Sequence, residues 1–236
     1  MGPAVESGAG GQPEADRRAD AERDLLTDFD RAYRVFHDMI ESFRALQDLG
    51  PAVTMYGSAR LKEGHPHYEL ARRTGAELAR SGYAVITGGG PGIMEAGNRG
   101  AHEAGGQSLG FNIVLPHEQG LNPYVDRTLT FEYFFVRKLM LRRYSQGFIL
   151  MPGGLGTLDE IFETATLIQC GKLARFPIVL MGVDYWQPIV DSIRQVMLSA
   201  GTVGEGEITM FKTDSPEEAV RYVREHAPGT ISLDVH

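Results

Sequence analysis

Short apolar runs that alternate with helix-length intervals are the feature that most constrains the fold of this chain. Six such runs lie between residues 53 and 181. Strands that alternate with helices of this length favour an α/β fold with a parallel, doubly wound sheet flanked by helices. The expected strands are Val53–Tyr56, Tyr83–Thr87, Ser108–Ile113, Thr128–Phe131, Gly147–Met151 and Ile178–Met181, with a last strand near Ile208–Phe211.

The expected helices fill the intervals between these strands. The run Ser215-Pro216-Glu217-Glu218 is typical of a helix start, with a capping serine, proline at the first position and glutamate at the third. We see no internal repeat and no second domain, so residues 25–236 are expected to form one domain. The expected helices cover residues 67–80, 93–104, 134–145, 158–170, 186–199 and a last stretch from Ser215.

The first residues differ in composition from the rest of the chain. Residues 1–24 are rich in glycine, alanine, proline and charge, which predicts a disordered tail. Residues 25–49 carry apolar side chains at alternating spacings of three and four, which predicts an additional N-terminal helix. Such a stripe packs either on the protein's own body or, because the same spacing makes a coiled-coil seam, on another subunit. The stripe consists of Leu26, Phe29, Tyr33, Phe36, Ile40 and Phe43.

Composition excludes several classes of protein. The 236 residues carry a formal net charge of −8, which argues against a broad nucleic-acid surface. The single cysteine, Cys170, excludes an internal disulfide framework and fits a reducing compartment. No apolar run reaches the roughly 20 residues of a membrane span, and the first residues lack the apolar stretch of a secretory signal. The chain is therefore expected to be cytoplasmic, with no membrane or nucleic-acid partner.

Two glycine-rich loops follow expected strands and open expected helices. In a parallel sheet, ligands bind outside the carboxyl ends of the strands, which is where both loops lie. Glycine lets the backbone approach a phosphate, and a helix N-terminus presents free N–H groups and partial positive charge. A tight turn without a ligand is the alternative for either loop alone, but two such loops on one edge favour an anion site. The loops are Gly88–Gly92 and Gly153–Thr157.

Neither loop has a familiar nucleotide signature. The chain lacks the GxxxxGK[ST] pattern of a triphosphatase. Gly154-Leu155-Gly156 is not completed by a third glycine, because position 159 is aspartate, so a dinucleotide site is also disfavoured. The loops are suited to a monophosphate, and no residue pattern calls for a metal or a cofactor.

Glu160 and Arg137 are the two charged residues that this edge could bring together. Thr157-Leu158-Asp159-Glu160 matches a capping box, which would give Glu160 a structural role. A carboxylate one turn into the helix would also face the ligand edge, which would give it a catalytic role. Arg137 lies in the first turn of the preceding helix and could converge on the same ligand, although spacing alone does not favour it over Lys138.

The motifs resemble those of the Lonely Guy family, whose members are Rossmann-like phosphoribohydrolases that release cytokinin or adenine bases from nucleoside 5′-monophosphates. Two motifs carry the resemblance: Pro152-Gly153-Gly154-Leu155-Gly156-Thr157-Leu158-Asp159-Glu160, and an Arg-Lys pair whose arginine lies 23 residues before that glutamate. The likeness covers roughly Val53 to Met197. The sequence Gly92-Ile93-Met94-Glu95-Ala96 and the additional N-terminal helix depart from short plant members and resemble a longer bacterial branch.

The resemblance implies a homodimer or larger homo-oligomer that takes a small nucleotide substrate. It makes Arg137 and Glu160 the catalytic pair. It also assigns substrate binding to Glu118, Lys138, Thr166 and the loop before Glu160, and the glycine loops complete the set. The predicted substrate-binding residues are Ser58, Gly88, Gly89, Gly90, Gly92, Glu118, Lys138, Gly153, Gly154, Leu155, Gly156, Thr157, Leu158, Asp159 and Thr166.

A mechanism follows from these roles. The base leaves through a transition state like an oxocarbenium ion, which a nearby carboxylate stabilises. The helix dipole and Arg137 are expected to lower the pKa of Glu160, so it would act as a base rather than as a proton donor. Asp159 is a candidate donor by proximity only. The alternatives are a nucleotide or molybdenum-cofactor carrier without catalysis, and a sensor that assembles through the N-terminal helix.

Overall fold

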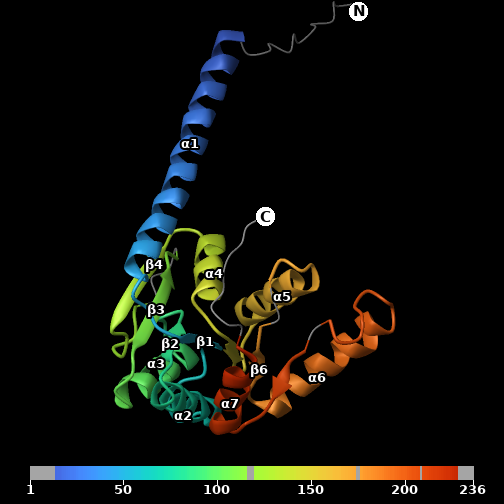
Figure 1. The fold of residues 1–236 in the computed structure, drawn as a ribbon. Coiled ribbons are helices and arrows are strands. Elements are labelled where there is room, and N and C mark those ends of the chain that lie inside the picture. The colour runs from blue at the N-terminus through green and yellow to red at the C-terminus, as the bar shows by residue number, and fades with distance from the viewer. Residues whose placement is uncertain (1–13, 116–119, 174–175, 208, 228–236) are drawn as a thin grey trace, which may run out of the picture.

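The computed structural model describes residues 14–115, 120–173, 176–207 and 209–227, which form a seven-stranded parallel sheet covered by helices on both faces (Figure 1). The expected α/β doubly wound fold is confirmed. The strands are β1 Ala52–Tyr56, β2 Ala84–Thr87, β3 Ser108–Ile113, β4 Arg127–Phe131, β5 Phe148–Leu150, β6 Ile178–Leu180 and β7 Phe211–Lys212. The helices are α1 Glu14–Ala45, α2 Pro66–Arg80, α3 Ile93–Glu103, α4 Phe134–Arg143, α5 Leu155–Gln169, α6 Val183–Ile193, the π-helical turn η1 Arg194–Leu198 and α7 Pro216–His226.

The strand order is β4-β3-β2-β1-β5-β6-β7, and every neighbouring pair is parallel. The chain runs outward from β1 to β4, returns across the sheet, and then continues from β5 to β7. Thr54 in β1 therefore lies between Ile86 of β2 and Phe148 of β5. The two halves of the sheet diverge at β1 and β5, and such a switch point leaves a crevice at the carboxyl ends of the strands.

Each face of the sheet has its own apolar core. On one face, α2, α3 and α7 contribute buried residues such as Leu78, Ile93 and Val223. On the other face, the base of α1 packs together with α4, α5 and α6, which bury residues such as Met140 and Trp186. Strands buried on both faces read as continuous apolar runs, which explains why the sequence located the inner strands well.

Several expected boundaries are wrong, among them the helix expected at 186–199, where α6 begins at Val183. Helix α1 begins at Glu14, so residues 14–24 are not a disordered tail, because alanine, arginine and glutamate in this stretch favour helix; residues 1–13 lie outside the described residues. Helix α5 begins at Leu155, three residues before the expected start at residue 158, with Gly154 as its N-cap. The last strand is the two-residue β7 rather than 208–211, and position 208 is not among the described residues.

The apolar stripe predicted on the N-terminal helix does not pack on the protein's own body along most of its length. Leu26, Phe29, Tyr33 and Phe36 are all exposed, and only the last part of the stripe, at Phe43, packs against the core. No helix among the described residues is long and apolar enough to cross a membrane.

Candidate active site

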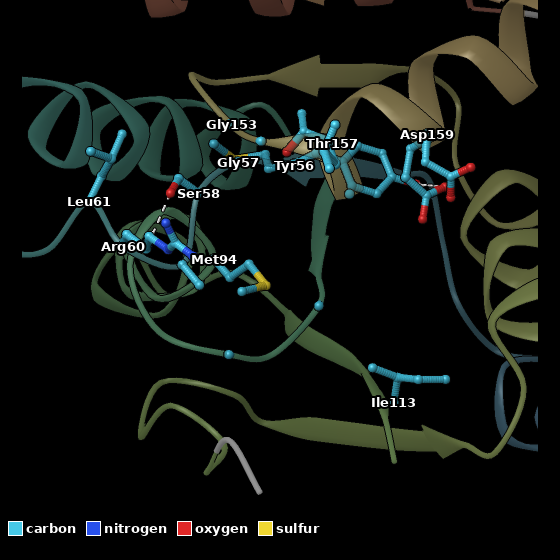
Figure 2. Close-up of a pocket in the computed structure, with 18 of the residues that line it drawn as sticks. Tyr56, Gly57, Ser58, Arg60, Leu61, Met94, Ile113, Gly153, Thr157 and Asp159 are labelled. Atoms are coloured by element: carbon cyan, nitrogen blue, oxygen red, sulfur yellow. Dashed lines mark hydrogen bonds between the residues drawn. The ribbon is translucent and has the colours of Figure 1, made fainter. Parts of the chain in front are cut away.

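A cavity of about 830 Å³ lies at the carboxyl ends of β1, β2, β3 and β5, at the switch point of the sheet. Loops after β1, β2 and β5 and the first residues of α4 and α5 form its walls. Figure 2 shows Ser58 and Arg60 toward one end of the cavity and Asp159 toward the other. The position is the one where doubly wound sheets bind ligands.

The loop after β2 needs glycine because other parts of the protein approach it closely. A β-carbon on Gly88 would lie 2.5 Å from Nη2 of Arg137 and 2.7 Å from Sδ of Met94. Gly92, at a φ of +70°, is the N-cap of α3, and a β-carbon there would lie 2.5 Å from the Ser58 carbonyl oxygen. Only glycine leaves room for Arg137 to extend across this loop.

A buried amide holds the same loop from the other side. Nδ2 of Asn122 donates hydrogen bonds to the carbonyl oxygens of Gly89 and Gly90, both at 3.0 Å. Asn122 also donates to Oδ1 of Asn98 at 3.0 Å, and that oxygen accepts from the Thr87 hydroxyl at 2.6 Å. The loop is therefore fixed by satisfied, buried hydrogen bonds.

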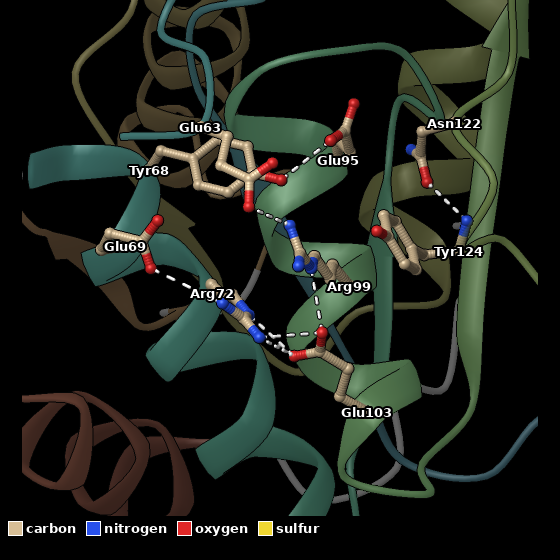
Figure 3. A network of polar contacts seen from close by, with 9 residues as sticks. All are labelled: Glu63, Tyr68, Glu69, Arg72, Glu95, Arg99, Glu103, Asn122 and Tyr124. Carbon is tan, nitrogen blue, oxygen red and sulfur yellow. Dashed lines mark hydrogen bonds and ion pairs between the residues drawn. The ribbon is translucent and has the colours of Figure 1, made fainter. Parts of the chain in front are cut away.

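A polar network ties this support to the loop after β1 (Figure 3). Arg99 of α3 pairs with Glu63 at 2.7 Å and with Glu103 at 2.9 Å. Its guanidinium lies 5.3 Å from the ring centroid of Tyr124, whose backbone N–H donates to Oδ1 of Asn122 at 3.2 Å. The loops after β1 and β2 are thus fastened to the same helix.

The loop after β5 is open at Gly154 and Gly156, although a β-carbon on Gly153 would collide with the Thr157 side chain. No atom lies within 4 Å of a β-carbon placed on Gly154 or Gly156, and both residues line the cavity. Gly154 caps α5, and its carbonyl oxygen accepts from the N–H groups of Thr157 and Leu158. The first turn of a helix presents backbone N–H groups and partial positive charge, so this opening suits an anion.

Glu160 lies in the second turn of α5, is 7% exposed and lines the cavity. The predicted capping box is wrong, because Gly154 rather than Thr157 caps the helix. The hydroxyl of Tyr56, at the end of β1, donates to Oε2 of Glu160 at 3.4 Å. Tyr56 is itself buried, so both groups lie in the wall between the sheet and α5.

Burial decides the charge of Glu160. It raises the pKa of this carboxyl to about 7, although the positive charges of Arg137 and Lys138 oppose the shift. The expected lowering of the pKa is therefore wrong, because desolvation outweighs the nearby cations. Glu160 is partly protonated at neutral pH, which removes the argument against it as a proton donor.

Arg137 reaches the same cavity from α4. Its Nε donates to the carbonyl oxygen of Phe111 at 2.7 Å, which directs the guanidinium across Gly88. No ion pair within 4 Å joins it to Glu160, although both side chains are described. Arg137 is thus positioned by the backbone of β3 and influences Glu160 through its charge.

Lys138, the next residue, faces carboxylates rather than the cavity. Its Nζ lies 3.0 Å from Oδ2 of Asp159 and 2.6 Å from Oε2 of Glu163. Arg142 pairs with the other oxygen of Glu163 at 3.3 Å. These ion pairs join α4 to α5 and so fix the relative position of the helices that carry Arg137 and Glu160.

The structure brings most of the predicted site residues to one place. Gly89, Gly92, Lys138, Leu158 and Thr166 do not line the cavity: Leu158 packs against the core, and the Thr166 hydroxyl donates to the Phe162 carbonyl. Glu118 lies outside the described residues. The predicted residues that line the cavity are Ser58, Gly88, Gly90, Arg137, Gly153, Gly154, Leu155, Gly156, Thr157, Asp159 and Glu160.

The sequence missed several residues of the site. Tyr56 ends an apolar strand and reads as a core residue, and Asn122 lies in a segment without a motif. Tyr185 donates from its hydroxyl to the Gly153 carbonyl at 2.7 Å, which braces the second loop from α6. Arg60 lines the cavity, and its place next to Gly57-Ser58 is a signal that could have found it.

Comparison with known proteins identifies the family with this site. The family model described as "Possible lysine decarboxylase" matches residues 94–223, which include Arg137, the second loop and Glu160. The chain belongs to this family, the Lonely Guy (LOG) family. The resemblance of the motifs is thereby confirmed for more than half of the chain.

The curated LOG relatives align over a shorter stretch. The cytokinin riboside 5′-monophosphate phosphoribohydrolase LOG of Oryza sativa subsp. japonica is 28% identical over 93 residues, or 39% of this chain and 38% of the rice protein. The enzyme LOG7 of Arabidopsis thaliana, which has the same activity name, is 30% identical over 93 residues, or 39% and 42% of the two chains. The match thus spans less than half the length of these relatives.

Solved structures share the fold of about three-quarters of this chain. The structural genomics target TM1055 is 27% identical, with a TM-score of 0.58 over 75% of this chain and 99% of that one. A molybdenum cofactor binding protein from Rippkaea orientalis is 22% identical, with a TM-score of 0.53 over 75% and 98% of the two chains. At that identity the second likeness shows the fold alone.

Proposed function

We propose that this LOG-family protein hydrolyses the N-glycosidic bond of nucleoside 5′-monophosphates, releasing the free base and ribose 5-phosphate. The observation that carries the proposal is the arrangement of one cavity: Glu160 and Arg137 face it from two helices, beside an open glycine loop at the start of α5. The activity name of the curated relatives supports the same reaction. Adenosine and prenylated adenosine 5′-monophosphates are the proposed substrates.

The second loop is the proposed phosphate site. The space beside Gly154 and Gly156 and the N-terminus of α5 favour an anion there. A phosphate bound at this point holds the ribose near Glu160, which follows one turn further along the same helix. Binding energy from the phosphate, remote from the reacting bond, then contributes to orientation.

The chemical step breaks the bond between C1′ and the base nitrogen. Positive charge develops on the ribose ring, and the ionised form of Glu160 stabilises it and takes a proton from the attacking water. The water oxygen bonds to C1′ as the bond from C1′ to the base breaks, and the bonding electron pair leaves with the base nitrogen. The base takes up a proton from solvent, and Glu160 returns the proton of the attacking water to solvent. With a pKa of about 7, Glu160 exchanges its proton readily at neutral pH.

The proposal is tested by incubating the purified full chain with AMP and, separately, with N6-isopentenyladenosine 5′-monophosphate, followed by chromatography of the free base. We expect release from at least one nucleotide, and the ratio of the two rates measures any preference for the prenyl group. Glu160→Gln should lower turnover by about 10² to 10⁴ while nucleotide binding persists. Arg137→Ala should likewise lower turnover.

Glu225→Gln is the control for Glu160→Gln. It removes the same charge from an exposed side chain of α7, outside the cavity, so turnover should stay within a few-fold of the original protein. Tight nucleotide binding with no base released from either substrate would overturn the hydrolase proposal and favour a carrier.

A further inference from the structure

Helix α1 has two apolar faces, and the body of the molecule covers only one of them. Val35, Met39 and Phe43 form the covered face, which packs on the core beside α4. Figure 1 shows the rest of the helix extending away from the sheet into open space. The uncovered face, called the α1 seam here, consists of Leu26, Phe29, Tyr33 and Phe36, which are 71%, 72%, 59% and 62% exposed.

The spacing of the α1 seam specifies what kind of surface fits it. Its residues follow at intervals of three, four and three, which places them at successive a and d positions of a heptad. Such a seam is filled by side chains of another helix with the same repeat. A second copy of α1 has the same repeat with the same apolar side chains.

The size of the α1 seam is sufficient for a specific contact. A fully buried aromatic side chain covers about 150–250 Å², and the three aromatic residues of the seam are about two-thirds exposed. Together with Leu25 and Leu26, two copies would bury on the order of 1,000 Å², which is the size at which specific interfaces begin. An extended helix with this much apolar surface in water is otherwise unfavourable.

The charges beside the seam disfavour a membrane as the occupant. Helices that lie on lipid surfaces carry lysine and arginine on the polar face to meet anionic headgroups. Here Arg31 pairs with Asp28 at 3.2 Å and Arg34 pairs with Asp30 at 2.7 Å, so the arginines are already neutralised within the helix.

We propose that the α1 seam docks on the α1 seam of a second copy of this chain. The contact is isologous, because the same residues face each other from both copies. The base of α1 is also joined to the body near the site: Asp38 accepts from the Glu132 backbone N–H at 3.4 Å, and Arg143 of α4 lies 5.0 Å from the ring centroid of Phe43. Helix α1 is thus anchored at its base to α4, the helix that carries Arg137.

Sedimentation or light scattering of the full chain over a concentration series tests this proposal. The double variant Phe29→Glu/Phe36→Glu places two charges in each copy of the seam and should raise the concentration at which the assembly dissociates by about a hundredfold. The double variant Phe29→Leu/Phe36→Leu keeps the seam apolar and should associate within a few-fold of the original chain.

The control places a charge on the opposite face of the same helix. Arg31→Glu lies away from the seam and should leave the dissociation curve unchanged, while far-UV circular dichroism reports whether the body is folded in each variant. Coincident curves for the original chain and the Glu double variant, or a monomeric original chain at all concentrations, would overturn the proposal. This result is independent of whether the protein hydrolyses nucleotides.

Discussion

The two glycine loops at the cavity look alike in the sequence but need glycine for opposite reasons. In the loop after β2, the glycines are surrounded: a β-carbon on Gly88 would collide with Arg137, and one on Gly92 with the Ser58 carbonyl. In the loop after β5, Gly154 and Gly156 border open space. The first loop is therefore part of the scaffold that positions Arg137, and the second leaves room for a ligand.

The difference shows that glycine in a strand-to-helix loop is not by itself a phosphate signal. Asn122 holds the first loop in place and Tyr185 braces the second, so both loops are supported by the body. What distinguishes them is the open space beside Gly154 and Gly156. Changes to each loop should therefore separate the positioning of Arg137 from ligand binding.

The largest effect is expected from Gly88→Ala. The new methyl group would lie 2.5 Å from Nη2 of Arg137 and 2.7 Å from the Met94 sulfur, so the ends of these two flexible side chains must shift. Because flexible side-chain ends can shift, the unfolding free energy should change little, whereas displacement of the Arg137 guanidinium should lower turnover by about a hundredfold. Urea denaturation and base release measure the two effects. Unchanged turnover would show that the loop after β2 does not position Arg137.

The next largest effect is the pH dependence of stability that the buried Glu160 carboxyl produces, in the helix that follows the loop after β5. Its folded pKa of about 7 exceeds the ordinary value of 4.5, so the folded state binds the proton more tightly than the unfolded chain. The stability contributed by the protonated form is complete below pH 4.5 and is lost as the pH rises through 7. Integrated over this interval, the loss is roughly 3 kcal/mol.

Glu160→Gln should remove this pH dependence. Urea unfolding of the variant and the original protein should give similar stabilities near pH 4.5, and the variant should be more stable at pH 8 by up to roughly 3 kcal/mol. A variant that is less stable at pH 8 than the original chain would contradict the raised pKa. Glu225→Gln, an exposed position on α7, provides the control.

A smaller effect is expected from Gly156→Ala, which sharpens the contrast with Gly88→Ala. The methyl group meets no atom of the protein, and alanine favours helix over glycine by up to about 1 kcal/mol. Stability should be unchanged or slightly higher. The KM for AMP should rise about tenfold, since the methyl group occupies the proposed phosphate space. An unchanged KM would place the phosphate elsewhere.

The smallest effect is expected from Tyr56→Phe. The hydroxyl donates to Oε2 of Glu160 at 3.4 Å, and removing it withdraws a hydrogen bond that favours the charged carboxylate. The limb of the pH–rate profile that reports Glu160 should move to higher pH, with turnover at pH 8 within a few-fold of the original. A shift to lower pH would contradict this arrangement.

The sequence predicted the sheet well and the local environment of the site less well. Apolar runs locate the inner strands because both faces of each strand are buried. The start of α5 was placed too late, because Thr157 and Glu160 match a capping box that Gly154 displaces. A capping box is recognised from two residues three positions apart. Which residue caps α5, however, depends on where the loop after β5 leaves the sheet.

The charge of Glu160 and the exposure of α1 depend on distant parts of the chain. Neighbouring residues suggested a lowered pKa for Glu160, but its burial beside Tyr56, 104 residues away, sets the opposite direction. Periodicity likewise predicted a helix with an apolar stripe. It could not show that Val35 and Met39, rather than Phe29 and Phe36, meet the body.

We propose that the two loops and Glu160 form a site that adds water to the C1′ carbon of a nucleotide. The most direct measurement is mass spectrometry of the products formed from AMP in ¹⁸O-labelled water by the original protein and by Glu160→Gln. We predict equal amounts of adenine and ribose 5-phosphate, with a single ¹⁸O atom in the sugar, and almost no product from the variant. Intact AMP after prolonged incubation with protein that binds it, or undiminished product from Glu160→Gln, would contradict hydrolysis at this site.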